Sequence, residues 1–370
     1  MLDASVERPV PLDLPALREV DDVLAAHIRR HGPVLEAVDA ELAPLVDDVA
    51  RLADGGKRLR AAFCLWGASA AAGASLDIGP AGPLPGAVEA AAALEMFHLA
   101  ALVHDDVMDR SETRRGLPSI HHAHAQRHRS SGYLGDARTY GDGVAVLVGD
   151  LCLTWSDDLL ARALTEVDGR RRTDARDVWE QMRTQVLAGQ YLDLLHQAQH
   201  DSRPEAVAQV LRYKSAKYTV EHPLLLGAAL GGATDDVRAG LSAFGLRVGE
   251  AFQLRDDVLG LFGDPRATGK AVHDDVREGK RTLLVTHAEA VADDVQRQTL
   301  RRHLGDPDVD VAGLHAVQDV VRATGALDHV ERQVARLVEE AATVLDGLRL
   351  DPTTHAALGS LSDACAWRAA

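Results

Sequence analysis

Apolar residues recur at intervals of three and four along most of the chain, which is the spacing of one face of an α-helix. The pattern is clearest in the stretches VLEAVDAELAPLVDDVARL, GAVEAAAALEMFHLAALVHDDV, VWEQMRTQVLAGQYLDLLHQ, LSAFGLRVGEAFQLRDDVLGLF and HVERQVARLVEEAATVLDGL. No segment shows a convincing alternation of apolar and polar residues, the pattern of a half-buried β-strand. We therefore expect an all-α fold.

Clusters of glycine, proline and small polar residues interrupt the helical pattern and predict loops. They fall at residues 53–56, 78–86, 114–119, 130–143 and 263–270. None resembles a linker between independent domains, so we expect one helical domain over residues 21–370. Residues 1–20 begin with acidic residues and prolines, and we expect them to be loosely ordered.

Composition supports this reading and excludes some partners. Hydrophobic residues make up 46% of the 370 residues and aromatic residues only 4%, a balance that favours helices over sheets. The net charge of −16 would repel a phosphate backbone, so we expect no nucleic-acid partner. The three cysteines, Cys64, Cys152 and Cys365, have neither disulfide nor metal-ligand spacing.

The location of the protein follows from what the chain does not display. The first twenty residues lack the basic patch and apolar stretch of a signal peptide. The longest uncharged run, residues 61–76, is too short to span a bilayer. We therefore expect a cytoplasmic protein without a membrane span.

Concentrated carboxylates end one of the apolar helical stretches. In VHDDVMDR, Asp105 and Asp109 are four residues apart with Asp106 beside them, so on a helix they share one patch about 6 Å long. Carboxylates this close repel each other, and a hard divalent cation such as Mg²⁺ resolves the repulsion. Asp256 and Asp257 end another apolar stretch. A single motif could equally be a solvated acidic face, but the pair favours metal ions clamped around a polyphosphate.

Basic side chains accompany both acidic motifs. GGKRLR at residues 55–60 offers a flexible turn with three cations, Arg114 and Arg115 follow the first motif, and Lys270 and Lys280 follow the second. Guanidinium and ammonium groups are the side chains that hold phosphate oxygens. Each could alone be a surface ion pair, but together they favour an anion site.

These motifs, in this order, resemble the trans-prenyltransferases, or isoprenyl diphosphate synthases, of the polyprenyl synthetase family, most of all bacterial geranylgeranyl diphosphate synthases. The resemblance covers about two thirds of the chain. Its segments are GGKRLR, EMFHLAALVHDDVMDRSETRRGLPSIH, LVGDLCL, GQYLDLL, YKSAKYTVEHPLLLGAAL and AFQLRDDVLGLFGDPRATGKAVHDDVREGKRTLLV. It implies the isoprenoid synthase fold, a helical bundle around a deep central cavity, in a homodimer.

The resemblance also implies an activity and its residues. The activity is Mg²⁺-dependent condensation of isopentenyl diphosphate with an allylic diphosphate: dimethylallyl, geranyl or farnesyl. The implied metal ligands, which are also catalytic, are Asp105, Asp106, Asp109, Asp256 and Asp257. The residues implied to bind isopentenyl diphosphate are Lys57, Arg60, His98 and Arg115. Those implied to contact the allylic diphosphate are Arg114, Lys217, Gln253, Lys270 and Lys280, and Lys217 is implied to be catalytic as well.

Two positions depart from the family pattern. Gly260 stands where the second motif has its third aspartate, which puts metal affinity on that side in doubt. A tyrosine separates Lys217 from Thr219, where the family has an adjacent Lys-Thr pair. The lysine is kept, but the hydroxyl contact is uncertain.

Product length depends on the residues that precede the first motif. Ala101 and Ala100 lie four and five residues before Asp105, and Phe97 lies eight before it. In this family small residues at the nearer positions imply a product longer than fifteen carbons, so we expect geranylgeranyl diphosphate, with Phe97 as the cavity floor. A farnesyl synthase or a longer-chain synthase is the alternative, and Phe97 could instead be ordinary core.

Three other functions compete with this interpretation. A class I terpene cyclase shares one aspartate motif but has no use for GGKRLR. A metal phosphohydrolase could use His98, His104 and Asp105 but leaves the second motif unused. An inactive partner subunit would be expected to have lost the first motif, which here is whole.

The remaining polar residues are less specific. The run HHAHAQRH, residues 121–128, could bind a metal, but we expect a solvated helix. His104 is expected to orient Asp105. Gly189, Gln190 and Asp193 resemble a further family motif that lines the cavity, although an ordinary polar helix face would look the same.

Overall fold

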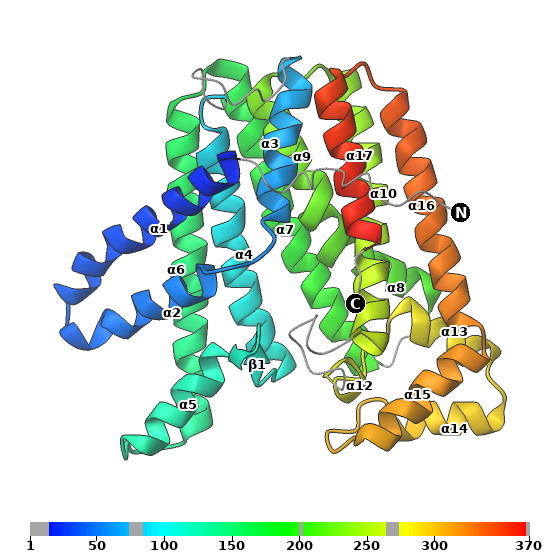
Figure 1. The fold of residues 1–370 in the computed structure, drawn as a ribbon. Helices are drawn as coiled ribbons and strands as arrows, with labels where there is room; N and C mark the ends of the chain where they lie inside the picture. Colours follow the sequence, from blue (N-terminus) through cyan, green and yellow to red (C-terminus); the bar gives the residue numbers. More distant parts are fainter. Residues whose placement is uncertain (1–14, 74–83, 200–202, 264–273, 368–370) are drawn as a thin grey trace, which may run out of the picture.

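The computed structural model describes residues 15–73, 84–199, 203–263 and 274–367. These residues form a bundle that is almost wholly helical (Figure 1), which confirms the all-α fold. The first helices are α1 (Pro15–Glu36), the 3-10 turn η1 (Ala40–Leu42), α2 (Ala43–Ala53), α3 (Leu59–Ala72), α4 (Ala87–Asp109), α5 (Ile120–Ser130), α6 (Ala137–Thr165) and α7 (Gly169–Gln199). Then follow α8 (Pro204–Val210), η2 (Leu211–Glu221), α9 (His222–Gly231), α10 (Asp235–Phe262), α12 (Asp274–Arg277), α13 (Leu283–Val291), α14 (Asp294–His303), α15 (Val311–Ala323), α16 (Ala326–Asp346) and α17 (Pro352–Ala366).

One short hairpin breaks the helical pattern. The strands β1 (Thr113–Arg114) and β2 (Leu117–Pro118) pair antiparallel, with Thr113 opposite Pro118. Arg115 and Gly116 form the turn with φ values of 53° and 74°, and two positive φ values in a two-residue turn favour a hairpin. The expectation of no strand is wrong here because two-residue strands are too short to show alternation. The hairpin directs the chain back toward the end of α4.

The alanine-rich helix α4 runs through the centre of the bundle. It packs against α6, α3 and α1, and it is buried on almost every side. Among the described residues it is the one helix long and apolar enough to cross a membrane, and most of it is enclosed by the protein. We interpret it as a core helix, since small side chains let its neighbours approach closely.

The hydrophobic core forms two clusters that meet at α10. One cluster fills the space among α1, α3, α4, α6, α7 and α9. The other lies among α10, α13, α15 and α16. Because α10 contributes to both clusters, the two parts of the bundle share one continuous helix.

A π-helix, η2, interrupts the regular geometry between α8 and α9. It packs between α7 and α10 at two glycines. A Cβ atom added at Gly189 would lie 2.3 Å from the backbone nitrogen of Lys214, and one at Gly249 would lie 2.4 Å from the carbonyl oxygen of Ala216. Only glycine fits at either position. π-helical turns are rare and often mark functional sites.

Several predicted boundaries shift in the structure. The predicted loop 130–143 is too long, because α6 begins at Ala137, where Asp136 accepts a hydrogen bond from the backbone of Thr139. Residues 15–20 belong to α1, with Leu17 and Val20 buried, so they are not the loose segment expected there. Residues 1–14, and most of the predicted loops 78–86 and 263–270, lie outside the described residues.

Candidate active site

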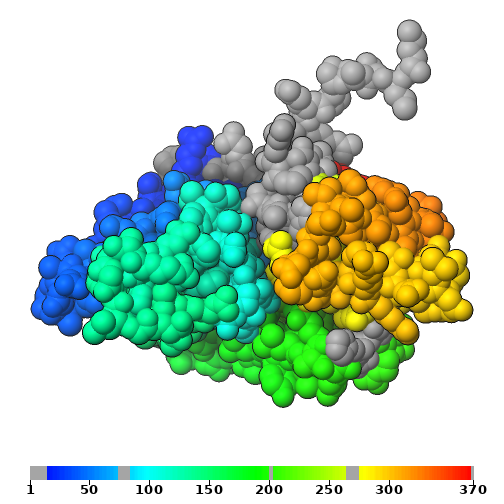
Figure 2. All heavy atoms as spheres, turned by 90° about the horizontal axis from the view of Figure 1, so that it is seen from below, coloured from blue at the N-terminus to red at the C-terminus, as the bar shows by residue number. Residues whose placement is uncertain are grey.

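A cavity of about 390 Å³ opens where α4 and α10 end. Carboxylates from both acidic motifs line it, together with side chains from α7, η2 and the segment that follows α12. Figure 2 looks onto this end of the bundle, where the cyan end of α4 and the hairpin face the yellow and orange segments α12–α15. The carboxylates that line the cavity are Asp105, Asp193, Asp256, Asp257 and Asp275.

The members of the first motif have different surroundings. Asp106 is 2% exposed and accepts hydrogen bonds from both Nε and Nη2 of Arg114, the first at 2.9 Å. Asp105 lines the cavity. Asp109 does not line the cavity; its side chain is 7% exposed and lies 4.0 Å from Lys280 Nζ, and burial together with the charge of Asp105 raises the pKa of Asp109. Asp106 therefore forms a buried ion pair with Arg114, while Asp105 faces the cavity.

In the second motif, Asp256 is exposed, and Asp257 is half-buried and accepts a hydrogen bond of 2.8 Å from Gln253 Nε2. Burial raises the pKa of Asp257 to about 8, and the charges of Asp256 and Asp275 also raise it. Without a bound cation, burial therefore favours the protonated form of this carboxyl near neutral pH.

The departure at Gly260 has a structural explanation. A Cβ atom at Gly260 would lie 1.9 Å from Oδ2 of Asp275, so the Asp275 carboxylate fills the space where a side chain at position 260 would begin. Asp275 lines the cavity from α12, 3.1 Å from Lys280 Nζ. The sequence reasoning missed Asp275 because it belongs to another element, although the HDD run at residues 273–275 was a visible signal.

Within η2, the lysine that faces the carboxylates is Lys214. Its Nζ lies 2.5 Å from Asp193 Oδ2 and 3.4 Å from Asp105 Oδ1, and both carboxylates raise its pKa against the effect of burial. Lys217 instead bonds Glu221 at 2.5 Å and does not line the cavity. The prediction that Lys217 faces the site is corrected, because the π-helix directs Lys214 inward. Asp193 and Gln190 line the cavity, as expected from their resemblance to a cavity-lining motif of the family.

Arginines gather at one side of the cavity around His98. Arg60 donates to Thr219 Oγ1 at 3.1 Å and lies 4.3 Å over the Tyr218 ring. His98 Nδ1 and the Tyr218 hydroxyl lie 3.2 Å apart and share a hydrogen bond. Burial lowers the pKa of His98, and so do four cations, Arg60, Arg115, Arg114 and Arg58. Such a concentration of positive charge suits an anion.

Other predicted anion ligands lie farther from the cavity lining. Arg115 donates from Nη1 to the carbonyl oxygen of Leu52 at 2.9 Å, and its guanidinium packs against Gly56. Lys57 is exposed, and neither residue lines the cavity. Lys280 and Gln253 do line it. Lys270 lies outside the described residues.

The three positions expected to set product length separate in the structure. Ala101 lines the cavity, whereas Ala100 and Phe97 do not. The Phe97 ring packs edge-on against Trp179 and Tyr218, with centroids 5.8 Å apart in both pairs. The prediction that Phe97 forms the cavity floor is therefore wrong, because Tyr218 and Phe252 are the phenyl rings that line the cavity and Phe97 packs behind Tyr218 in the core.

Two expectations about histidines are also wrong. His104 points to α6, with Nε2 3.2 Å from the carbonyl oxygen of Val146, so it does not orient Asp105. The run 121–128 is helical, but His124 is buried and its Nε2 lies 2.6 Å from Asp48 Oδ2. These histidines stabilise helix packing instead of facing solvent. Because His98 and His104 contact different helices, they do not form the metal site of a phosphohydrolase.

Comparisons with known proteins agree with this geometry. The model of the polyprenyl synthetase family matches residues 44–321. The chain belongs to the polyprenyl synthetase family. It is a trans-prenyltransferase, and this membership sets aside the phosphohydrolase interpretation.

Relatives and solved structures include several prenyl diphosphate synthases. The geranylfarnesyl diphosphate synthase of Aeropyrum pernix is 31% identical over 79% of this chain and 83% of its own length. The geranylgeranyl diphosphate synthase of Saccharolobus solfataricus is 32% identical over 64% of this chain and 66% of its own. The structure of a geranylgeranyl pyrophosphate synthase from Corynebacterium glutamicum, complexed with isoprenyl diphosphate and magnesium, is 33% identical with a TM-score of 0.90, and the match covers 95% of this chain and 98% of that one.

Proposed function

We propose that this polyprenyl synthetase condenses isopentenyl diphosphate with allylic diphosphates to make geranylgeranyl diphosphate. The observation that carries the proposal is the cavity itself, since two carboxylate clusters and a group of arginines surround one space. A diphosphate held by metal ions needs the carboxylates, and a second diphosphate needs the arginines. A terpene cyclase, which takes one diphosphate, leaves the arginine group unexplained.

The carboxylates fit Mg²⁺. Hard oxygen donors are the ligands that Mg²⁺ prefers, and the space at Gly260 brings in a third carboxylate on the second side. We propose that Asp105 and Asp109 hold the ion on one side and Asp256, Asp257 and Asp275 hold it on the other. Asp106, fully engaged with Arg114, orients that arginine. When bound, Mg²⁺ would stabilise the negative charge that develops on the leaving diphosphate.

The chain's own cations complete the two anion sites. We assign Lys214, Lys280 and Arg114 to the allylic diphosphate, because all three line the cavity beside the carboxylates. Arg60 and His98 are assigned to isopentenyl diphosphate, with Arg115 and Lys57 at its outer edge. Fixed donors of this kind stabilise charge without the reorganisation that water would need.

The proposed twenty-carbon product rests on the family relatives and on Ala101. A small side chain at Ala101 leaves room on the wall about 6 Å below Asp105, one helical turn away. The relatives include synthases named for twenty-carbon and longer products. The product length is therefore the most specific claim in the proposal, and variants test it separately. Ala101→Phe should shorten the product to fifteen carbons. Phe97→Ala changes no lining residue and should leave the length unchanged.

The test is an assay of purified protein with Mg²⁺, labelled isopentenyl diphosphate and each allylic primer, with products resolved by length. Twenty-carbon product from dimethylallyl, geranyl and farnesyl primers is the expected result. A hydrocarbon formed from a long allylic diphosphate alone, without use of isopentenyl diphosphate, would overturn the proposal in favour of a cyclase. No incorporation with any primer would favour the inactive subunit.

We further propose, from the family resemblance, that the protein is a cytoplasmic homodimer with one catalytic domain, which includes the whole of α1 and so begins before residue 21. Sedimentation of the purified chain tests the dimer directly, because a monomer at micromolar concentration would contradict it.

A further inference from the structure

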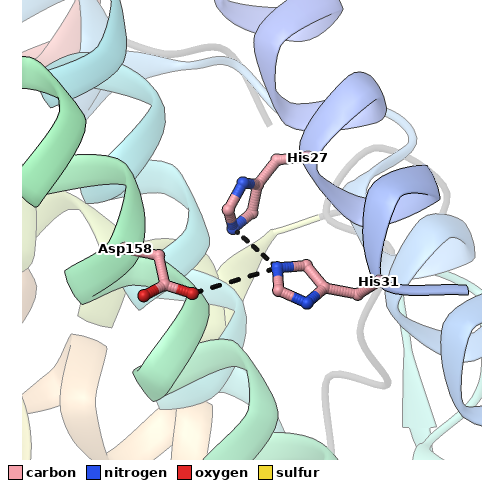
Figure 3. A group of neighbouring side chains, drawn as sticks. All are labelled: His27, His31 and Asp158. Atoms are coloured by element: carbon pink, nitrogen blue, oxygen red, sulfur yellow. Dashed lines mark hydrogen bonds and ion pairs between the residues drawn. The ribbon is translucent and has the colours of Figure 1, made fainter. Parts of the chain in front are cut away.

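Two histidines and a carboxylate converge away from the cavity, where α1 crosses α6 (Figure 3). His27 and His31 are four residues apart on α1, so they project from one face toward Asp158 on α6. Their Nε2 atoms lie 3.3 Å apart. His31 Nε2 lies 3.9 Å from Asp158 Oδ2, and the three ligand atoms all lie within 4.8 Å of one another.

These separations suit a tetrahedral metal ion. Zinc–nitrogen bonds of 2.0–2.1 Å place two tetrahedral ligands about 3.3 Å apart, close to the separation of the two histidine nitrogens. Asp158 Oδ2 now lies 3.9 Å from His31 Nε2 and within 4.8 Å of the His27 ligand atom, so its exposed carboxylate would have to swing toward both rings to complete a tetrahedral set. Imidazole with carboxylate is typical of zinc and its transition-metal neighbours, whereas Mg²⁺ takes oxygen ligands.

The surrounding residues hold the two imidazoles in place. The Trp155 side chain stacks on the His31 ring with centroids 4.5 Å apart and an angle of 14° between the planes. It also meets the His27 ring edge-on at 6.4 Å. His27 is 1% exposed, and its Nδ1 has no hydrogen-bond partner among the described residues. The rings are therefore fixed before any ion arrives, which lowers the entropic cost of binding.

Some of the charges near His27, His31 and Asp158 favour a bound cation and others oppose it. Burial and the nearby Arg162 lower the pKa of His27 to about 4, and burial lowers that of His31. Both directions favour the neutral form of imidazole, the form that donates a lone pair to a metal. Arg30 and Arg162 oppose a cation, while Asp158 favours it. Affinity is thus expected to depend on Asp158.

We propose that His27, His31 and Asp158 form a binding site for a first-row transition-metal ion such as Zn²⁺, with water as the fourth ligand. The ion ties α1 to α6. In the structure α1 projects from the bundle with α2 (Figure 1) and packs mainly on α4 and α2, so this bond adds a separate anchor. The site is independent of the Mg²⁺ proposed for the cavity.

Cobalt titration tests the site, because Co²⁺ replaces Zn²⁺ and its visible absorption reports coordination geometry. The full chain, freed of metal with a chelator and then kept in excess Mg²⁺ to occupy the cavity carboxylates, is titrated with Co²⁺. We expect about one equivalent to give the intense bands of a four-coordinate ion, and Zn²⁺ to displace them. The melting temperature should rise with Zn²⁺ under the same conditions.

Variants locate the ion. His31→Gln should abolish the bands. Asp158→Asn should weaken Co²⁺ binding at least about tenfold, the loss that even outer-shell changes cause at metal sites. Asp158 is 56% exposed, so this variant is expected to fold even if His31→Gln does not. The control is His355→Gln, which removes a histidine that pairs with Asp346 at 3.0 Å but has no second histidine.

Each outcome of the titration either supports the metal site or overturns it. Bands in wild type and His355→Gln, reduced in Asp158→Asn and lost in His31→Gln, support the site. No bands in wild type would overturn it and leave the two histidines as a hydrogen-bonded pair. Bands of equal strength in wild type and Asp158→Asn would also overturn it, because the ion would then lie elsewhere.

Discussion

The first carboxylate cluster comes from the last turns of one helix, α4, whereas the second is assembled from two elements, α10 and α12. Asp105, Asp106 and Asp109 are neighbours because of helical geometry alone. Asp275 joins the second cluster only because Gly260 leaves it room. The first cluster therefore follows from the spacing of nearby residues in the sequence, whereas the second depends on the tertiary packing of α12 against α10.

The two clusters also differ in how their charge is balanced. Cations face the first one: Arg114 bonds Asp106, and Lys214 lies 3.4 Å from Asp105. In the second cluster, Asp257 has the amide of Gln253 as its partner and a pKa raised to about 8. The protein thus compensates Asp105 and Asp106 of the first cluster with cations, and Asp275 of the second with Lys280, whereas Asp257 has a neutral amide as its hydrogen-bond partner and its ionisation is favoured by a bound metal ion.

The largest effect on turnover is expected from Asp105→Ala. It removes a carboxylate that no other element replaces, so turnover should fall at least about a hundredfold, equivalent to about 2.7 kcal/mol. Stability should hold or rise, because Asp109 loses a like-charged neighbour. Steady-state kinetics and thermal melting measure both. The control is Asp294→Ala, which changes a fully exposed carboxylate, and more than a tenth of wild-type rate in Asp105→Ala would contradict the assignment.

Gly260→Ala should have the next largest effect, on the second cluster. Its Cβ atom would displace the Asp275 carboxylate. We expect the variant to need about tenfold more Mg²⁺ to reach half its maximal rate, a loss of about 1.4 kcal/mol in the free energy of Mg²⁺ binding. The double variant Gly260→Asp with Asp275→Ala moves the carboxylate to the family's usual position and should recover the affinity. Unchanged Mg²⁺ dependence in Gly260→Ala would show that Asp275 takes no part.

Lys214→Ala and Lys217→Ala form a matched pair that tests which cation serves the first cluster. Loss of Lys214 should raise the Michaelis constant for the allylic substrate about tenfold, since a hydrogen bond to a charged group contributes about 1.5–3 kcal/mol. Lys217→Ala should leave that constant unchanged. It should instead lower stability by about 3–5 kcal/mol, because the buried Glu221 carboxylate loses its ion-pair partner and keeps only the neutral donor Ser242 among the described residues. The reverse pattern would restore the sequence-based assignment.

Much of the fold and half of the site could be predicted because their signals are local. Helical periodicity identified the all-α class, and the four-residue spacing of Asp105 and Asp109 placed them together. The π-helix could not be predicted, because it packs closely against Gly189 and Gly249, which are distant in the sequence. The assignment of Lys217 rests on the family's Lys-Thr pair alone, and that pattern does not show which lysine of the π-helix faces the cavity. The position of Phe97 behind Tyr218 depends on ring packing between helices, which one-dimensional spacing does not contain.

The smallest effect on the enzyme is expected from Asp257→Asn, which should change how the stability of the protein depends on pH. The pKa of Asp257 is raised from 3.8 to about 8 in the folded protein, so between these values the folded state holds a proton that the unfolded state has lost. Stability without Mg²⁺ should therefore fall as pH rises from about 4 to about 8. Asp257→Asn removes this contribution, and the difference in unfolding free energy between pH 5 and pH 8 should shrink by at least about 1.4 kcal/mol, the equivalent of one pKa unit.

Urea unfolding at the two pH values, with chelator present, measures the effect of Asp257→Asn. Asp109, whose pKa is also raised, should leave some pH dependence in the variant. Asp256→Asn is the matched control, because it changes the exposed neighbour and should keep most of the wild-type slope, since burial is the largest cause of the raised pKa and the charge of Asp256 a smaller one. If Asp257→Asn and Asp256→Asn had equal slopes, Asp257 would be ionised without a cation. The second cluster would then be compensated within the protein, as the first one is, and the contrast between the two would fail.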